Sequence, residues 1–170
     1  MRIFITLAFT LSQVFVLITS LAWAQLKISS PDFENNGDIP REFTCQGKDI
    51  NPQLIIGNVP DTAKSLALIV DDPDAPIGTW VHWVVYDIPP ETKNIDKSSV
   101  PGQEGINSFG RQSFGGPCPP DGKHRYFFKL YALDVYFGLI EQIPDKIALE
   151  KFMEGHVVDK AELIGLYQKE

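Results

Sequence analysis

Three carboxylates follow directly on a strongly apolar stretch of the chain. The stretch Ser65-Leu-Ala-Leu-Ile-Val70 runs into Asp71-Asp72-Pro73-Asp74-Ala75-Pro76. A carboxylate at the end of a buried strand can accept hydrogen bonds from a ligand or orient a histidine. Asp and Pro also form turns without any ligand, because an Asp side chain can bond its own backbone two residues on. The segment alone is compatible with a site built on Asp72 and with a plain turn.

Two histidines stand at strand positions among apolar neighbours. Side-chain alternation places His82 on one face with Val84, and His124 on one face with Tyr126. Imidazole and phenol groups donate hydrogen bonds, and imidazole titrates near neutral pH, so the set suits a phosphate or carboxylate headgroup. A histidine on an apolar face is also typical of an ordinary hydrogen-bonded core residue.

A loop rich in proline and glycine, Gly115-Gly-Pro-Cys-Pro-Pro-Asp-Gly122, precedes His124. Proline fixes the backbone angle φ, so this loop is stiff. It could be a mere connector, or a preorganised wall whose N–H groups face an anion. Together with the Asp cluster and both histidines, it predicts one small anion pocket at the strand ends. An Asp beside a dianion repels it, so a histidine must be protonated or the ligand must carry a proton or an amine.

Enzyme signatures are missing from this set. The chain has no Gly-x-Ser-x-Gly elbow, no glycine-rich phosphate loop before a helix and no zinc-type Cys or His spacing. We therefore expect a binding protein that is not an enzyme and needs no cofactor and no metal. Two alternatives stay open: a metal site of His82, His124 and Asp72, and a hydrolase that uses His and Asp as acid and base.

The elements that must position these residues are mainly strands. Glycine and proline, 13 of each, separate short apolar runs, which favours a mainly β fold such as a β-sandwich. The apolar run at 65–70 indicates a central strand covered on both faces. Two short helices are expected near the C-terminus, at about 146–153 and 159–168, capped by Asp145 and Asp159. The strands expected from alternation and composition are 26–29, 42–45, 54–56, 65–70, 81–86 and 125–131.

The N-terminus predicts export. Met1-Arg2 is followed by an apolar run to Ala22, and Ala22-Trp-Ala24 offers small residues for a signal peptidase. Residues 1–24 are thus predicted to be a signal peptide, which leaves 25–170 as a single periplasmic or secreted domain without bilayer insertion. The alternative is an uncleaved N-terminal membrane anchor.

Charge and cysteine content narrow the partners and the compartment. The 170 residues carry 15 Lys plus Arg against 22 Asp plus Glu, a net charge of −7 with no basic run, so nucleic acid is not an expected partner. Cys45 and Cys118 are the two cysteines. In an exported protein an even number favours a disulfide, and two separate buried thiols are the alternative.

Four motifs occur in order along the chain: Asp71-Asp-Pro-Asp-Ala-Pro76, Trp80-Val-His-Trp83, Gly115-Gly-Pro-Cys-Pro-Pro120 and His124-Arg-Tyr126. In this combination the chain resembles the phosphatidylethanolamine-binding protein family, in particular its bacterial Raf kinase inhibitor-like branch. The resemblance implies a large antiparallel sheet packed on a smaller sheet, with short C-terminal helices. It also implies a pocket for phosphate-like or carboxylate anions, supported by Asp74, Trp80 and Gly116 and lined by Asp72, His82, Cys118, Pro119, Pro120, His124 and Tyr126.

The resemblance further implies a binding and regulatory role. The expected function is exported binding of a phosphate or phospholipid headgroup, or of another phospho-ligand. The alternative is a protein-interaction module that inhibits a protease, a kinase or a host factor through loops at the pocket rim. Two positions depart from the expected pattern: Ser108 stands where Asp is expected, and Phe114 where Tyr is expected.

Overall fold

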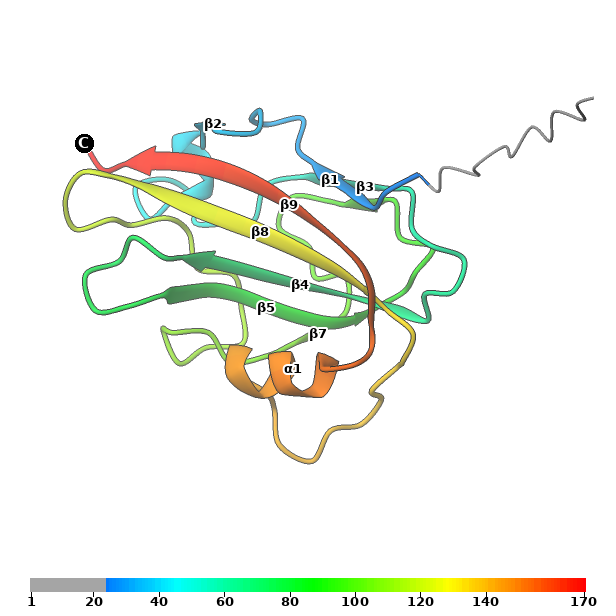
Figure 1. Ribbon diagram of the computed structural model, residues 1–170. Helices are drawn as coiled ribbons and strands as arrows, with labels where there is room; N and C mark the ends of the chain where they lie inside the picture. The colour runs from blue at the N-terminus through cyan, green and yellow to red at the C-terminus, as the bar shows by residue number, and fades with distance from the viewer. Residues whose placement is uncertain (1–23) are drawn as a thin grey trace, which may run out of the picture.

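The computed structural model describes residues 24–170, which form two β-sheets and one short helix (Figure 1). The large sheet has six strands in the order β2-β9-β8-β4-β5-β7, and the small sheet has three in the order β1-β3-β6. The elements are β1 (Lys27–Ser29), β2 (Gly37–Asp38), the 3-10 helix η1 (Arg41–Phe43), β3 (Leu54–Gly57), β4 (Ser65–Asp72), β5 (Trp80–Ile88), β6 (Asn94–Ile95), β7 (Gln103–Glu104), β8 (Lys123–Leu133), α1 (Lys146–Met153) and β9 (Val157–Gln168).

Strand β4 lies inside the large sheet and is buried along its whole length. Its side chains alternate between two cores, as the pleat of a strand requires. Leu68 and its neighbours on that face pack against the small sheet, whereas Ile69 on the opposite face joins the core beneath α1. The expectation of a central strand covered on both faces is therefore confirmed.

The predicted fold class is confirmed, with a large sheet packed on a smaller one and little helix. The helix expected at about 146–153 is α1, and the side chain of Asp145 caps it by accepting from the N–H of Ala148. One detail differs, because β2 joins β9 in parallel and the large sheet is therefore not wholly antiparallel.

The helix predicted at 159–168 is wrong, because these residues belong to β9. Strand β9 pairs with β8 from Gln168 opposite Lys123 to Val157 opposite Leu133, and the two run side by side in Figure 1. Leu163, Gly165 and Tyr167 are buried and alternate with less buried residues, which is the two-residue period of a strand. The carboxylate of Asp159 accepts a hydrogen bond from the N–H of Leu26 and caps no helix.

The strand predicted at 42–45 is also wrong, because the chain curls there into η1. Both the N–H and the hydroxyl of Thr44 donate to the carbonyl of Arg41, at 3.1 and 2.9 Å, which closes the turn. Phe43 is buried in the main core and holds this turn against the sheets.

The predicted leader, residues 1–24, lies outside the described residues except for Ala24. Within 24–170, no helix has the length and apolar character needed to cross a membrane.

Candidate functional site

A pocket of about 390 Å³ opens where β4 ends and β5 begins. The antiparallel register of these strands sets Asp72 opposite Trp80, so the acidic turn and the first residues of β5 share one edge of the sheet. The proline-rich loop closes the pocket from the other side. The lining residues are Asp72, Ala75, Pro76, Ile77, Trp80, His82, Phe109, Cys118, Pro119 and Pro120.

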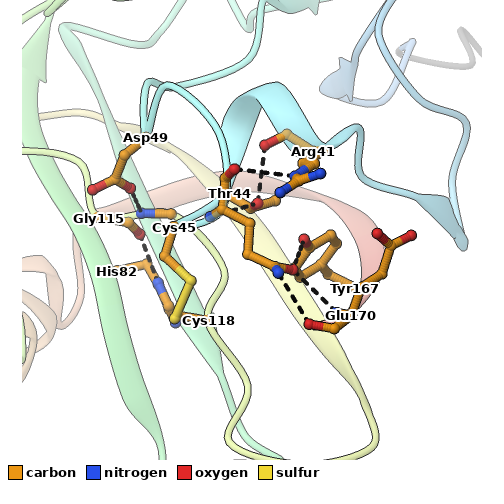
Figure 2. The surroundings of a disulfide bond; sticks show 11 residues. Arg41, Thr44, Cys45, Asp49, His82, Gly115, Cys118, Tyr167 and Glu170 are labelled. Atoms are coloured by element: carbon orange, nitrogen blue, oxygen red, sulfur yellow. Dashed lines mark hydrogen bonds between the residues drawn. A yellow bond between two sulfur atoms is a disulfide. The ribbon is translucent and has the colours of Figure 1, made fainter.

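His82 is the buried histidine of this pocket, with 3% of its surface exposed. Its Nδ1 lies 2.6 Å from the carbonyl oxygen of Gly115 (Figure 2). Because a carbonyl oxygen only accepts, Nδ1 carries the hydrogen and donates it, and Nε2 is the ring nitrogen left for a ligand. The rings of Phe109 and Tyr126 meet the imidazole edge-on at 5.6 and 5.2 Å and fix its orientation.

Burial lowers the pKa of His82 below its ordinary value. The bond to Gly115 and the charges of Asp72 and Asp71 act in the opposite direction, but burial is the largest cause. His82 is therefore neutral near pH 7, and its Nε2 offers a lone pair rather than a proton. This state favours a ligand that brings its own proton.

The lowered pKa of His82 predicts how stability depends on pH. Below about pH 6.5 the unfolded histidine binds a proton that the folded one resists, so the free energy of unfolding falls with falling pH, by at most about 1.4 kcal/mol per pH unit for this group. His82→Asn, which can still donate to Gly115, should show a shallower fall between pH 7 and pH 5. Urea unfolding of both proteins measures this difference, and equal slopes would contradict the assignment.

Asp72 and His124 form a buried pair behind the pocket. The Nδ1 of His124 lies 2.8 Å from one carboxylate oxygen of Asp72, and the other oxygen accepts from the N–H of Asp74 at 2.8 Å. Asp72 lines the pocket, whereas His124 reaches it only through Asp72. Both oxygens of Asp72 are thus already engaged.

Tyr126 is fully buried against His82 and is not among the residues that line the pocket. Its hydroxyl makes no hydrogen bond of normal geometry with the described residues. Burial, followed by the nearby Asp72 charge, raises the pKa of Tyr126, so the hydroxyl keeps its proton. The hydroxyl therefore stays a neutral group next to Asp72 and the Cys118 backbone, behind the pocket lining.

Asp74, a predicted supporting residue, lies outside the pocket lining. Its carboxylate accepts from the guanidinium of Arg125 at 2.6 and 2.9 Å and from the N–H of the same residue at 3.0 Å. These contacts lower the pKa of Asp74 to about 2. Arg125 is therefore committed to Asp74 at the sheet surface.

The proline-rich loop is tied to the turn that follows η1 (Figure 2). Cys45 and Cys118 form a disulfide, so the predicted pairing is confirmed and the alternative of two separate thiols is wrong. The N–H of Gly116 donates to the carboxylate of Asp49 at 2.6 Å, and the N–H of Cys45 donates to the carbonyl of Pro117 at 3.1 Å. A side chain at 116 would lie 2.5 Å from the backbone oxygen of Phe43, so only glycine allows this close approach.

The pocket combines a polar floor with an apolar mouth. None of the ten residues that line it is a lysine or an arginine. At the mouth, Ile77 is 82% exposed and Phe109 is 39% exposed, and the rings of Trp80 and Phe109 pack edge to face at 5.3 Å. The guanidinium of Arg111 lies 5.1 Å from the Phe109 ring and is a nearby cation at the rim.

The structure brings together Asp72, Trp80, His82 and Cys118-Pro-Pro120 as lining residues, and it sets His124, Tyr126 and Gly116 directly behind them. Ligand contact by any of them stays a prediction. Among the described residues no three His, Cys, Asp or Glu side chains converge as metal ligands do.

Sequence reasoning missed Asp49, Ile77 and Phe109. Asp49 lies far along the chain from Gly116, and only the disulfide neighbourhood would have indicated the contact. The two departures from the family pattern lie away from the lining. The Ser108 hydroxyl accepts from the N–H of Val81 at 2.8 Å, and the Phe114 ring packs on Trp83.

Comparison with known families matches residues 29–168 to the family described as "Phosphatidylethanolamine-binding protein". A UPF0098 protein of Aquifex aeolicus is 45% identical over 159 residues, which cover 89% of this chain and 93% of that protein. A UPF0098 protein of Pyrococcus horikoshii is 47% identical over 154 residues, which cover 85% of this chain and 77% of that protein.

Two solved structures are similar over the same domain. The Chlamydia trachomatis protein CT736, described as a putative phosphatidylethanolamine-binding protein homolog, gives a TM-score of 0.83 at 40% identity, over 86% of this chain and 99% of that chain. YbcL of E. coli, described as a new member of the mammalian family, gives a TM-score of 0.78 at 27% identity, over 86% of this chain and 100% of that chain.

Proposed function

Because the chain belongs to the phosphatidylethanolamine-binding protein family, we propose that its pocket binds a small ligand through a phosphate-like or carboxylate headgroup. The observation that carries the proposal is the buried, neutral His82, whose Nε2 has no partner among residues 24–170 and lies in a pocket of about 390 Å³. That volume is typical of small-molecule sites, which are mostly apolar with a few placed polar groups.

The charges of the residues that line the pocket favour one ionisation state of the headgroup over another. Asp72 is acidic, His82 is neutral, and no lysine or arginine lines the site. A fully ionised phosphate would meet a carboxylate and a lone pair, both of which repel it. A monoprotonated phosphate donates its proton to Nε2 and carries one charge less. A zwitterion such as phosphoethanolamine also sets a cation near Asp72 and the aromatic rings of Trp80 and Phe109.

The residues that line the pocket favour ligand binding over catalysis. The one sulfur-bearing residue of the lining, Cys118, is in a disulfide, and no serine, threonine or lysine lines the pocket. We therefore propose that this domain binds its ligand without converting it. The regulatory role and the location in the periplasm or outside the cell come from the sequence-based expectations and complete the proposal. The family match covers residues 29–168 and so lies wholly within the predicted exported domain.

Calorimetric titration at pH 6 and pH 8 tests the proposal. Phosphoethanolamine, a phosphate monoester, loses its last phosphate proton near pH 6, so its affinity should fall on going to pH 8. Glycerophosphoethanolamine, a phosphodiester, keeps one negative charge at both pH values but has no phosphate proton to donate to Nε2. It should therefore bind more weakly than the monoester at pH 6 and keep that same affinity of its own at pH 8. A fall for the monoester alone indicates that the ligand brings the proton.

Equal falls for both ligands would show that a histidine titrates instead, which would contradict a neutral His82. No heat from either ligand at either pH would overturn the headgroup proposal. The function would then pass to the protein-interaction alternative, for which the exposed Ile77 and Phe109 at the rim are the available apolar surface.

A further inference from the structure

The disulfide that ends in the pocket wall is accessible to solvent. Cys45 and Cys118 are both exposed, and Cys118 also lines the pocket. The bond joins two surface loops, and neither half lies in a strand or in either hydrophobic core. Thiol–disulfide exchange needs access to a sulfur, and exposed disulfides are the ones that reductants open most readily.

The two loops joined by the bond are held very differently by the rest of the protein. On the Cys45 side, Phe43 is buried, and the side-chain carbonyl of Gln46 accepts from the Tyr167 hydroxyl at 2.6 Å and from the N–H of Glu170 at 3.1 Å. This contact anchors the turn to the end of β9, as Figure 2 shows around Tyr167 and Glu170. The Cys45 side therefore stays in place when the bond opens.

The Cys118 side is held by fewer contacts. The carbonyl of Pro117 accepts from the N–H of Cys45 and Pro119 is buried, but no side chain among residues 118–122 forms a hydrogen bond with another described residue. The prolines at 119 and 120 have no N–H to donate. The preceding residues keep their own ties, since Gly115 bonds His82 and Gly116 bonds Asp49. Opening the disulfide thus removes the covalent tie of Cys118 to the turn after η1, which leaves residues 118–122 with the packing of Pro119 and leaves His82 in position.

We propose that the Cys45–Cys118 disulfide is a redox latch on this pocket: a thioredoxin-type dithiol opens it, the wall Cys118-Pro-Pro120 loosens, and ligand affinity falls. The inference rests on the headgroup-binding function proposed above. A thiolate of the dithiol attacks one sulfur, forms a mixed disulfide and releases the other cysteine. Its second thiol then attacks the mixed disulfide, so that the dithiol leaves oxidised and the protein gains two electrons and two protons.

Titration of the oxidised and the dithiothreitol-reduced protein with phosphoethanolamine at pH 6 tests the latch. We expect the reduced protein to bind about tenfold more weakly, because the loosened wall must be ordered on binding. The double variant Cys45→Ser with Cys118→Ser should bind as weakly as the reduced protein and should not respond to dithiothreitol. Near-UV circular dichroism on each sample establishes that it is folded.

A second measurement separates a latch from a plain structural staple. By linkage, a ligand that prefers the oxidised form must oppose reduction to the same extent. Saturating phosphoethanolamine should therefore lower the midpoint potential of the disulfide by about 30 mV for a tenfold preference. Thiol titration in dithiothreitol redox buffers, with and without the ligand, gives this shift.

The results of these two measurements can contradict the latch alone, or the latch together with the proposed binding function. Equal affinity of both redox forms, or a midpoint potential unchanged by ligand, would overturn the latch and leave the binding function intact. Loss of the folded circular dichroism signal on reduction would also overturn it, because the bond would then be a staple of the fold. Failure of the oxidised protein to bind would remove the proposed function and the latch with it.

Discussion

Replacing both Cys45 and Cys118 with serine should lower the free energy of unfolding by about 4 kcal/mol, the chain-entropy value for a closed loop of this length. The two cysteines are 73 residues apart, so the bond removes much freedom from the unfolded chain. The folded state loses little, because both half-cystines lie on surface loops outside the two cores. Urea unfolding of the variant and of the oxidised parent measures the difference.

Reduction of the parent protein is the matched control for this variant. Reduced parent and double variant should unfold at the same urea midpoint, since both lack only the cross-link. A loss below about 1 kcal/mol would contradict the loop-entropy account. The fold should persist in either case, because a domain of this size commonly has 5 to 15 kcal/mol of stability, about 4 of which is removed.

The central strands and the pocket motifs could be predicted because their signals are local. The run at 66–70 is apolar without interruption, as is typical of a strand buried on both faces, and the structure buries all of β4. Alternation in the next strand placed His82 on a buried face. Antiparallel pairing of neighbouring strands then brings the carboxylates after β4 and the start of β5 to one edge.

The errors arose where distant contacts decide the local structure. The segment 159–168 contains good helix formers, yet its pairing with β8 and the burial of Leu163 and Tyr167 make it a strand. At Gly165 an added side chain would lie 2.5 Å from Ile39, so the close approach of another segment explains this glycine. Neither partner is adjacent in the sequence, and a pattern of ten residues does not contain them.

The state of His82 likewise depended on the fold. Its sequence position indicates an apolar face but not the carbonyl that its Nδ1 finds at Gly115, 33 residues away. That bond fixes the tautomer, and burial fixes the charge. Sequence reasoning left open whether the histidine or the ligand carries the proton, and the lowered pKa of His82 is the reason why our proposal gives the proton to the ligand.

His82→Asn should weaken phosphoethanolamine binding by about tenfold or more, the cost of a lost hydrogen bond to a charged group. The asparagine amide occupies the place of Nδ1 and can still donate to Gly115, whereas the position of Nε2 becomes empty. Stability at pH 7 should therefore change little while affinity falls. Calorimetric titration at pH 6, with urea unfolding of the same sample, measures both effects.

His82→Gln is the complementary variant, because its longer side chain sets a polar group near the place of Nε2 and gives up the bond to Gly115. A buried carbonyl left without its donor costs about 1 to 3 kcal/mol, so this variant should be less stable yet keep more affinity than His82→Asn. His156→Asn, at an exposed histidine paired with Asp134, controls for general effects of losing an imidazole. If His82→Asn bound phosphoethanolamine as tightly as the parent protein, Nε2 would not be the ligand-binding atom, and the headgroup proposal would lose the observation that carries it.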